Sequence, residues 1–136
     1  MVYKYLVCLD GSEVSYRAYS WAHSQAMADE LRNTHIYLLN IVDKMKIERK
    51  EISIKGVEEF VKDLEAYKIP FEAIVLETTH NLKQTICEVA EKNNVDMIII
   101  GHDDEHKRRL HRIFDGHSDV YEYVIKHSQC AVLVFK

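Results

Sequence analysis

Residues 96–136 read DMIIIGHDDEHKRRLHRIFDGHSDVYEYVIKHSQCAVLVFK, and this stretch decides the fold. An apolar strand over Met97–Ile100 breaks at Gly101, a charged segment follows, a short helix opens near Asp119, and a second apolar strand covers Ala131–Phe135. A strand, a crossover and a further strand form a βαβ unit, whose two strands run parallel. Parallel sheets bind ligands where loops leave the carboxyl ends of their strands. The loop that follows Gly101 is therefore the first place to look for a function.

The same alternation of strand and helix extends back to the start of the chain. Nearly continuous apolar runs predict further strands over Tyr3–Leu9, Ile36–Val42 and Phe71–Leu76. Helical spacing predicts a first helix over roughly residues 13–33, with an apolar stripe of Val14, Ala18, Trp21, Ala28 and Leu31. Residues 43–55 carry many charges and are predicted as partly loop.

Two more helices complete the alternation. One carries Val57, Phe60, Val61 and Leu64 and ends before Pro70, and the next is capped by Asn81 and Gln84 and carries Leu82, Ile86, Val89 and Ala90. We therefore predict an α/β fold: a single domain over residues 1–136 with a doubly wound, five-stranded parallel sheet of order 3-2-1-4-5 and helices on both faces.

Composition narrows the class of protein. A net charge of -4 over 136 residues argues against a nucleic-acid partner, because phosphate affinity needs clustered cations. No apolar run approaches the roughly twenty residues of a membrane helix, so no membrane partner is expected. Three cysteines without a CxxC pair predict free thiols in a reducing, cytoplasmic compartment.

Two of the four glycines, Gly11 and Gly101, directly follow the first and fourth predicted strands. In the order 3-2-1-4-5 these two strands flank the point where the winding reverses and a crevice opens. A residue without Cβ permits positive φ or close approach of backbone or ligand there. Each glycine alone would fit a tight turn, but the two together predict a ligand crevice.

Three segments resemble the universal stress protein family: LVCLDGSEVSYRAYSWA at 6–22, VDMIIIG at 95–101 and YEYVIKHSQCAVLVFK at 121–136. The resemblance covers the whole chain and implies the fold derived above. It also implies a role in stress response or regulation and a homodimer formed through the last strand, Ala131–Phe135. One branch of the family binds ATP or related adenine nucleotides.

The resemblance also implies residues for the adenosine half of a nucleotide site. In the nucleotide-binding branch the Asp that ends the first strand and a backbone position that ends the second strand hold the adenosine. These positions carry over to Asp10, within the turn Asp10, Gly11 and Ser12, and to Val42 with its neighbour Ile41. From the residues alone, Asp10 is equally suited to capping a turn or a helix.

The phosphate half departs from the family pattern, which is Gly, two residues, Gly, nine residues, then Gly followed by Ser or Thr. Gly101 fits the first position, but Asp104 occupies the second and no glycine stands nine residues further on. Aligned on the last helix, the Gly-Ser position falls on Ser118 and Asp119, with Gly116 displaced. The phosphate loop is therefore altered.

The alteration places negative charge where a phosphate would bind. Asp119 and Glu122 form a capping pair, so the Asp119 carboxylate takes helix N–H groups that would otherwise meet an anion. We expect weak or absent ATP binding, with AMP less penalised and no metal beyond the Mg²⁺ that accompanies a nucleotide. The opposing observation is a basic run that could reach phosphates with its side chains: Lys107, Arg108, Arg109 and Arg112.

Three other functions stay open at this point. The loop 102–117 holds four histidines among acidic residues, which are metal ligand types, although a charged surface loop is the simpler reading: His102, His106, His111 and His117. The same loop could instead contact a protein partner in a module that binds no nucleotide. No catalytic motif is present, so the chain is expected not to be an enzyme, with slow ATP hydrolysis as the remaining catalytic alternative.

Overall fold

The computed structural model describes residues 3–43, 47–78, 82–102 and 120–136. Its strands and helices alternate as the sequence predicts. In chain order they are β1 (Tyr3–Cys8), α1 (Glu13–Ala28), β2 (Thr34–Asp43), α2 (Ile47–Ala66), β3 (Phe71–Thr78), α3 (Leu82–Lys92), β4 (Met97–Gly101), α5 (Val120–His127) and β5 (Ala131–Phe135).

The five strands form one parallel sheet in the order β3-β2-β1-β4-β5, which confirms the predicted topology. The strands are parallel because each connection carries the chain back along the sheet before the next strand begins. All carboxyl ends therefore lie at one edge of the sheet. β3 and β5 are the two edge strands.

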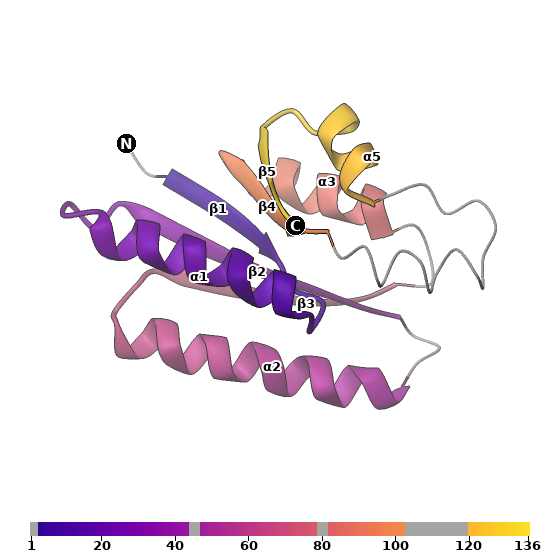
Figure 1. Ribbon diagram of the computed structural model, residues 1–136, viewed down its shortest axis with the longest axis horizontal. Coiled ribbons are helices and arrows are strands. Elements are labelled where there is room, and N and C mark those ends of the chain that lie inside the picture. Colours follow the sequence, from indigo (N-terminus) through magenta and orange to yellow (C-terminus); the bar gives the residue numbers. More distant parts are fainter. Residues whose placement is uncertain (1–2, 44–46, 79–81, 103–119) are drawn as a thin grey trace.

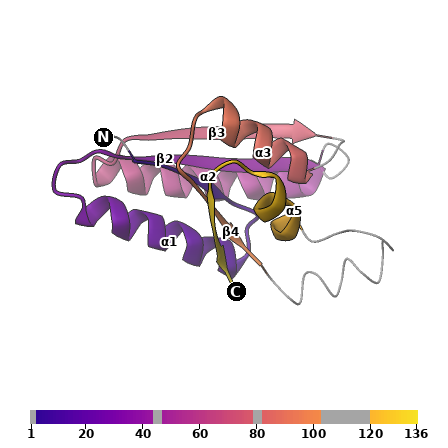
Figure 2. The ribbon, with the colours of Figure 1, turned by 90° about the horizontal axis from the view of Figure 1, so that it is seen from above.

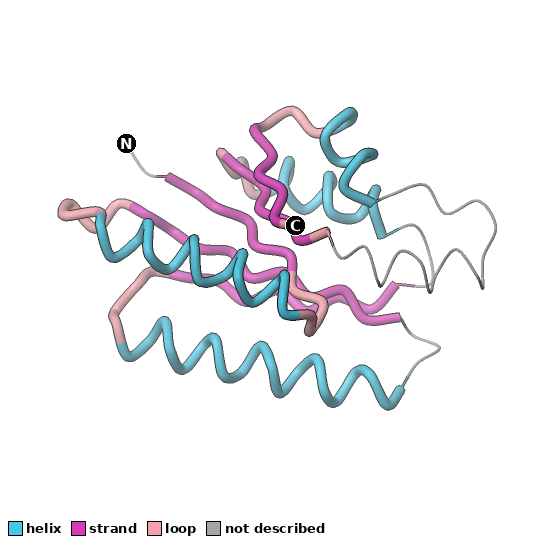
Figure 3. Tube along the Cα trace, in the orientation of Figure 1, coloured by secondary structure: helices cyan, strands magenta, loops and turns pink. Residues whose placement is uncertain are grey.

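Helices cover both faces of the sheet (Figures 1 and 3). In Figure 2, α3 and α5 lie in front of the sheet and α2 lies behind it. Successive side chains of each strand point to opposite faces of the sheet and contribute to two separate hydrophobic cores. Val7, Leu38 and Ile99 pack toward α1 and α2, whereas Leu6 and Ile98 pack toward α3 and α5. Completely burying an aliphatic side chain of this size contributes about 1.5–3 kcal/mol.

Helix α1 is shorter than predicted. Its buried stripe of Ala18, Ala22 and Ala26 ends at Ala28, and Leu31 lies beyond the helix with 79% of its surface exposed. The Asp29 carboxylate accepts hydrogen bonds from the backbone N–H groups of Leu31 and Asn33 and from the Thr34 hydroxyl. These bonds replace helical ones, because a short polar side chain competes for backbone donors. The prediction of helix up to residue 33, with Leu31 in its stripe, was therefore wrong.

Helix α2 begins earlier than predicted. It already covers residues 47–55, where the charge density indicated a partly looped segment. Val57 and Leu64 are buried as expected, and the Ile69 N–H closes the carboxyl end on the Leu64 carbonyl at 3.0 Å, just before Pro70. Charged residues favour a helix as readily as a loop when one side of it faces solvent.

Helices α1 and α2 are joined by a polar contact above their shared core. The Tyr19 hydroxyl donates to Asp63 Oδ2 at 2.5 Å, and the Tyr19 ring packs on Phe60 with 4.2 Å between centroids. Burial and this hydrogen bond raise the pKa of Tyr19. Across the ranges that the structure describes, no helix is both long and apolar enough to cross a bilayer.

Candidate functional site

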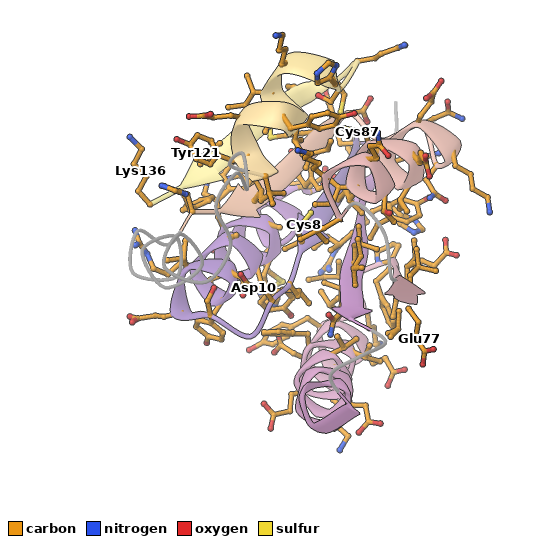
Figure 4. All side chains as sticks on the ribbon, turned by 90° about the vertical axis from the view of Figure 1, so that its right-hand side faces the viewer. Cys8, Asp10, Glu77, Cys87, Tyr121 and Lys136 are labelled. Atoms are coloured by element: carbon orange, nitrogen blue, oxygen red, sulfur yellow. The ribbon has the colours of Figure 1, made fainter. Side chains whose placement is uncertain are left out.

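The turn after β1 places a carboxylate at the centre of the carboxyl edge (Figure 4). Asp10 Oδ1 accepts from the Ser12 N–H at 2.9 Å, and Gly11 has φ +83°, a conformation that favours glycine. Ser12 then caps α1, because its hydroxyl accepts from the Ser15 N–H at 3.1 Å. Asp10 is exposed, and within the described ranges no other hydrogen bond reaches it. Asp10 thus orders the turn with Oδ1, while its Oδ2 has no hydrogen-bond partner among the described residues.

The end of β2 extends beyond its pairing with β1, so its last backbone groups on that side have no partner strand within the described ranges. The last β1–β2 contact is the Leu9 N–H on the Leu39 carbonyl at 2.8 Å, after which β1 turns away, while β2 stays paired with β3 as far as Asp43. Successive residues of a strand direct their N–H and C=O groups to opposite neighbours. Leu39 faces β1, so Ile41 faces the side that β1 has left, and Val42 faces β3. Of the two residues predicted at this position, Ile41 is therefore the one whose backbone N–H and C=O have no partner strand in the part of the chain that the structure describes.

Gly101 ends β4 against helix α1. A Cβ at this position would lie 2.7 Å from Val14 Cγ1 and 3.1 Å from the Val14 carbonyl carbon, both closer than normal packing allows. Helix packing thus gives a complete reason for glycine here. The sequence interpretation allowed a backbone or a ligand to approach this glycine, and the structure shows that Val14 does.

Two rings are in contact at the carboxyl edge beyond β4, with 51° between their planes. The His102 N–H donates to the Phe135 carbonyl at 2.6 Å, and the His102 ring lies on Tyr121 of α5 with 4.3 Å between centroids. In the view of Figure 4, Tyr121 and Lys136 lie on one side of Asp10 and Glu77 lies on the other.

Sequence reasoning did not place three residues at this edge: Glu77, Tyr121 and Val14, the last of which it assigned only to the apolar stripe of the first helix. Only Glu77 had a usable signal, since it stands near the end of a predicted strand whose neighbour in the sheet ends at Val42.

The predicted phosphate-side residues Gly116, Ser118 and Asp119 lie outside the described residues, as do the basic run 107–112 and the histidines of the loop other than His102. Within the described ranges, no group of three histidine, cysteine or acidic side chains is placed to hold a metal ion. The altered phosphate loop and the metal-binding alternative both stay predictions.

The three cysteines are free thiols around the core on the α3 and α5 side of the sheet. Burial raises the pKa of the Cys8 thiol to about 12, with smaller contributions from Asp10 and Cys87. Burial is also the largest cause of the raised pKa values of Cys87 and Cys130. Since the thiolate is the nucleophile, all three are suited to packing rather than to reaction at neutral pH.

The fold and the edge geometry define a class: a doubly wound α/β domain with a polar turn at the carboxyl ends of its strands, where such folds bind ligands. The sequence profile described as the universal stress protein family matches residues 1–136. The chain therefore belongs to the universal stress protein family, as the resemblance implied. No curated protein matches its sequence.

Solved structures share the fold over nearly their whole length. The hypothetical protein MJ0577, reported as a test case of structural genomics, is 28% identical, with a TM-score of 0.71 over 100% of this chain and 96% of that one. An AMP-bound universal stress protein family member from Arabidopsis thaliana is 18% identical, with a TM-score of 0.74 over 98% and 91% of the two chains. A universal stress protein from Archaeoglobus fulgidus in complex with dAMP is 15% identical, with a TM-score of 0.67 over 100% and 98%.

Proposed function

We propose that this protein is a stress-response or regulatory binding protein, and that its crevice takes an adenine nucleotide with few phosphates in preference to ATP. The observation that carries the proposal is that the Asp10 carboxylate and the backbone of Ile41, which has no β1 partner among the described residues, both lie at the carboxyl edge of the sheet. A carboxylate accepts hydrogen bonds from ribose hydroxyls, and a backbone N–H and C=O together match the donor and acceptor on one edge of adenine. Related structures with AMP and dAMP support this ligand class.

The phosphate half of the proposal rests on sequence. Asp119 is an anion at the amino end of α5, where a phosphate would otherwise gain from the unpaired N–H groups of the helix. Asp103 and Asp104 add two negative charges to the segment that follows Gly101, the first position of the family's phosphate pattern, so each added phosphate is expected to meet more repulsion. The repulsion between the protein and the ligand therefore grows from AMP to ATP. Because ATP is the disfavoured ligand, we propose that the protein binds a nucleotide and does not hydrolyse ATP.

Calorimetric titration with AMP and with Mg-ATP tests this preference. We expect AMP to bind at least as tightly as Mg-ATP, because a single like-charge contact of about 1 kcal/mol lowers affinity several-fold. ATP that binds more tightly than AMP would contradict the charge argument, and phosphate release from ATP would support the enzymatic alternative instead.

We also propose that two copies pair through β5. This strand is an edge of the sheet, its five residues carry no charge, and Val132, Leu133, Val134 and Phe135 are only half-buried. Edge strands of this kind normally find a partner strand or carry charges that prevent pairing. Sedimentation equilibrium should give twice the mass of the chain; the mass of a single chain at every concentration would refute the dimer.

A further inference from the structure

A histidine lies among apolar and charged groups at the opposite, amino edge of the sheet. His35 is the second residue of β2, and its ring stacks on Tyr37 with 4.7 Å between centroids and 26° between planes. Its Nε2 atom is buried and has no hydrogen-bond partner among the residues that the structure describes. A buried polar atom without a partner is tolerated at lower cost when it is neutral than when it carries a proton and a charge.

The charged neighbours of His35 do not remove this cost. Lys4 of β1 is its register partner and repels a protonated imidazole, whereas Glu72 of β3 attracts it. Lys4 is itself anchored at the turn before β4, because its N–H donates to Asp96 Oδ2 at 2.8 Å. Burial is the largest effect and lowers the pKa of His35, with Lys4 acting in the same direction and Glu72 opposing it.

The direction in which stability changes with pH follows from the lowered pKa of His35. A histidine with a lowered folded-state pKa takes up its proton more readily in any state that exposes the ring. Its contribution to stability is therefore complete above the ordinary value of about 6.5 and declines as the pH falls below it.

We propose that His35 makes the amino edge of the sheet acid-sensitive: uptake of a proton by its ring loosens the pairing of β2 with β1 and β3 there, while the carboxyl edge keeps its structure. The exposed form of the ring is reached by opening only the amino ends of these strands. Two backbone bonds would break in this opening, the Ile36 N–H on the Pro70 carbonyl and the Tyr3 N–H on the Asn33 carbonyl, both 3.0 Å. The inference does not depend on nucleotide binding, since it concerns the edge remote from Asp10.

Amide hydrogen exchange of the whole chain, measured one pH unit above and one below about 6.5 and corrected for intrinsic exchange rates, tests the proposal. The protection factors of Ile36 and Tyr3 should fall by up to about tenfold per pH unit, the limit for one proton. The Leu9 amide, which donates to the Leu39 carbonyl near the carboxyl edge, should keep its protection.

The variant His35→Phe keeps a ring on Tyr37 but cannot take up a proton. It should hold the protection of Ile36 constant across this pH range and remain at least as stable as the wild type above it, because it removes a buried atom without a partner. His127→Phe is the matched control. The His127 ring also packs on a tyrosine, Tyr123, with 4.1 Å between ring centroids, but His127 is exposed to solvent. His127→Phe should behave as the wild type.

Two results would overturn the proposal. One is an equal acid-dependent loss of protection in the wild type and in His35→Phe, or in His35→Gln if the phenylalanine variant does not fold. The other is a loss at Leu9 as large as that at Ile36, since it would mean that the whole domain opens.

Discussion

Replacing Gly101 with alanine should lower the free energy of unfolding by about 1–3 kcal/mol, the usual cost of forcing an extra carbon into a packed site. The added Cβ would meet Val14 Cγ1 at 2.7 Å and the Val14 Cβ and carbonyl carbon at 3.1 Å. Valine is stiff at χ1 and the carbonyl carbon belongs to helix α1, so the helix must shift away from β4. Denaturant unfolding monitored by circular dichroism measures the loss.

The same substitution at Gly56 is the matched control. Gly56 lies within α2, and a Cβ there would have no neighbour within 4 Å. Gly56→Ala should therefore stabilise the protein by about 0.5–1 kcal/mol through helix propensity. Adding Val14→Ala to Gly101→Ala should recover part of the loss, because it removes the Cγ1 atom at 2.7 Å and leaves the contacts with the Cβ and the carbonyl carbon of residue 14 at 3.1 Å. Purely additive effects of the two substitutions would show that the close approach does not occur.

The fold was predictable because its signals are local and repeated. Each strand is an apolar run and each helix carries an apolar stripe, so the alternation and the order of strands could be derived before any contact was known. The end of α1 could not be predicted, because Leu31 continues the helical spacing of apolar residues beyond the last residue of the helix. A competition between the Asp29 side chain and helical hydrogen bonds decides the boundary, and that competition depends on where Thr34 enters β2.

The candidate site was predictable only in outline. Asp10, Ile41 and Gly101 follow or end neighbouring strands, which is enough to place them at one edge of a parallel sheet. The choice between Ile41 and Val42 depends on the exact register of β1 and β2, and the reason for Gly101 depends on where Val14 lies. Neither the register of these two strands nor the position of Val14 against Gly101 can be predicted from the spacing of residues in the sequence. The roles of Gly116, Ser118 and Asp119 stay predictions from the sequence.

The ligand role of Asp10 can be separated from its structural role by the variant Asp10→Asn. An asparagine oxygen can still accept from the Ser12 N–H, so the turn before α1 should persist. The charge that would hold the ribose hydroxyls is lost, and hydrogen bonds to charged groups contribute about 1.5–3 kcal/mol. This loss corresponds to roughly ten- to a hundredfold weaker binding. If Asp10 made no contact with the ribose and acted only through its charge, Asp10→Asn would instead bind AMP more tightly, because removing a negative charge favours an anionic nucleotide. The direction of the change in affinity therefore distinguishes the two roles.

The most direct test is therefore isothermal titration of AMP into the wild type, Asp10→Asn and a control, Glu13→Ala, which removes an exposed carboxylate from the first turn of α1. We expect the wild type and Glu13→Ala to bind AMP with similar affinity and Asp10→Asn to bind it at least about tenfold more weakly, with its melting temperature unchanged. A wild type that takes up no AMP, or an Asp10→Asn variant that binds it as tightly as the wild type, would contradict the placement of an adenine nucleotide in this crevice.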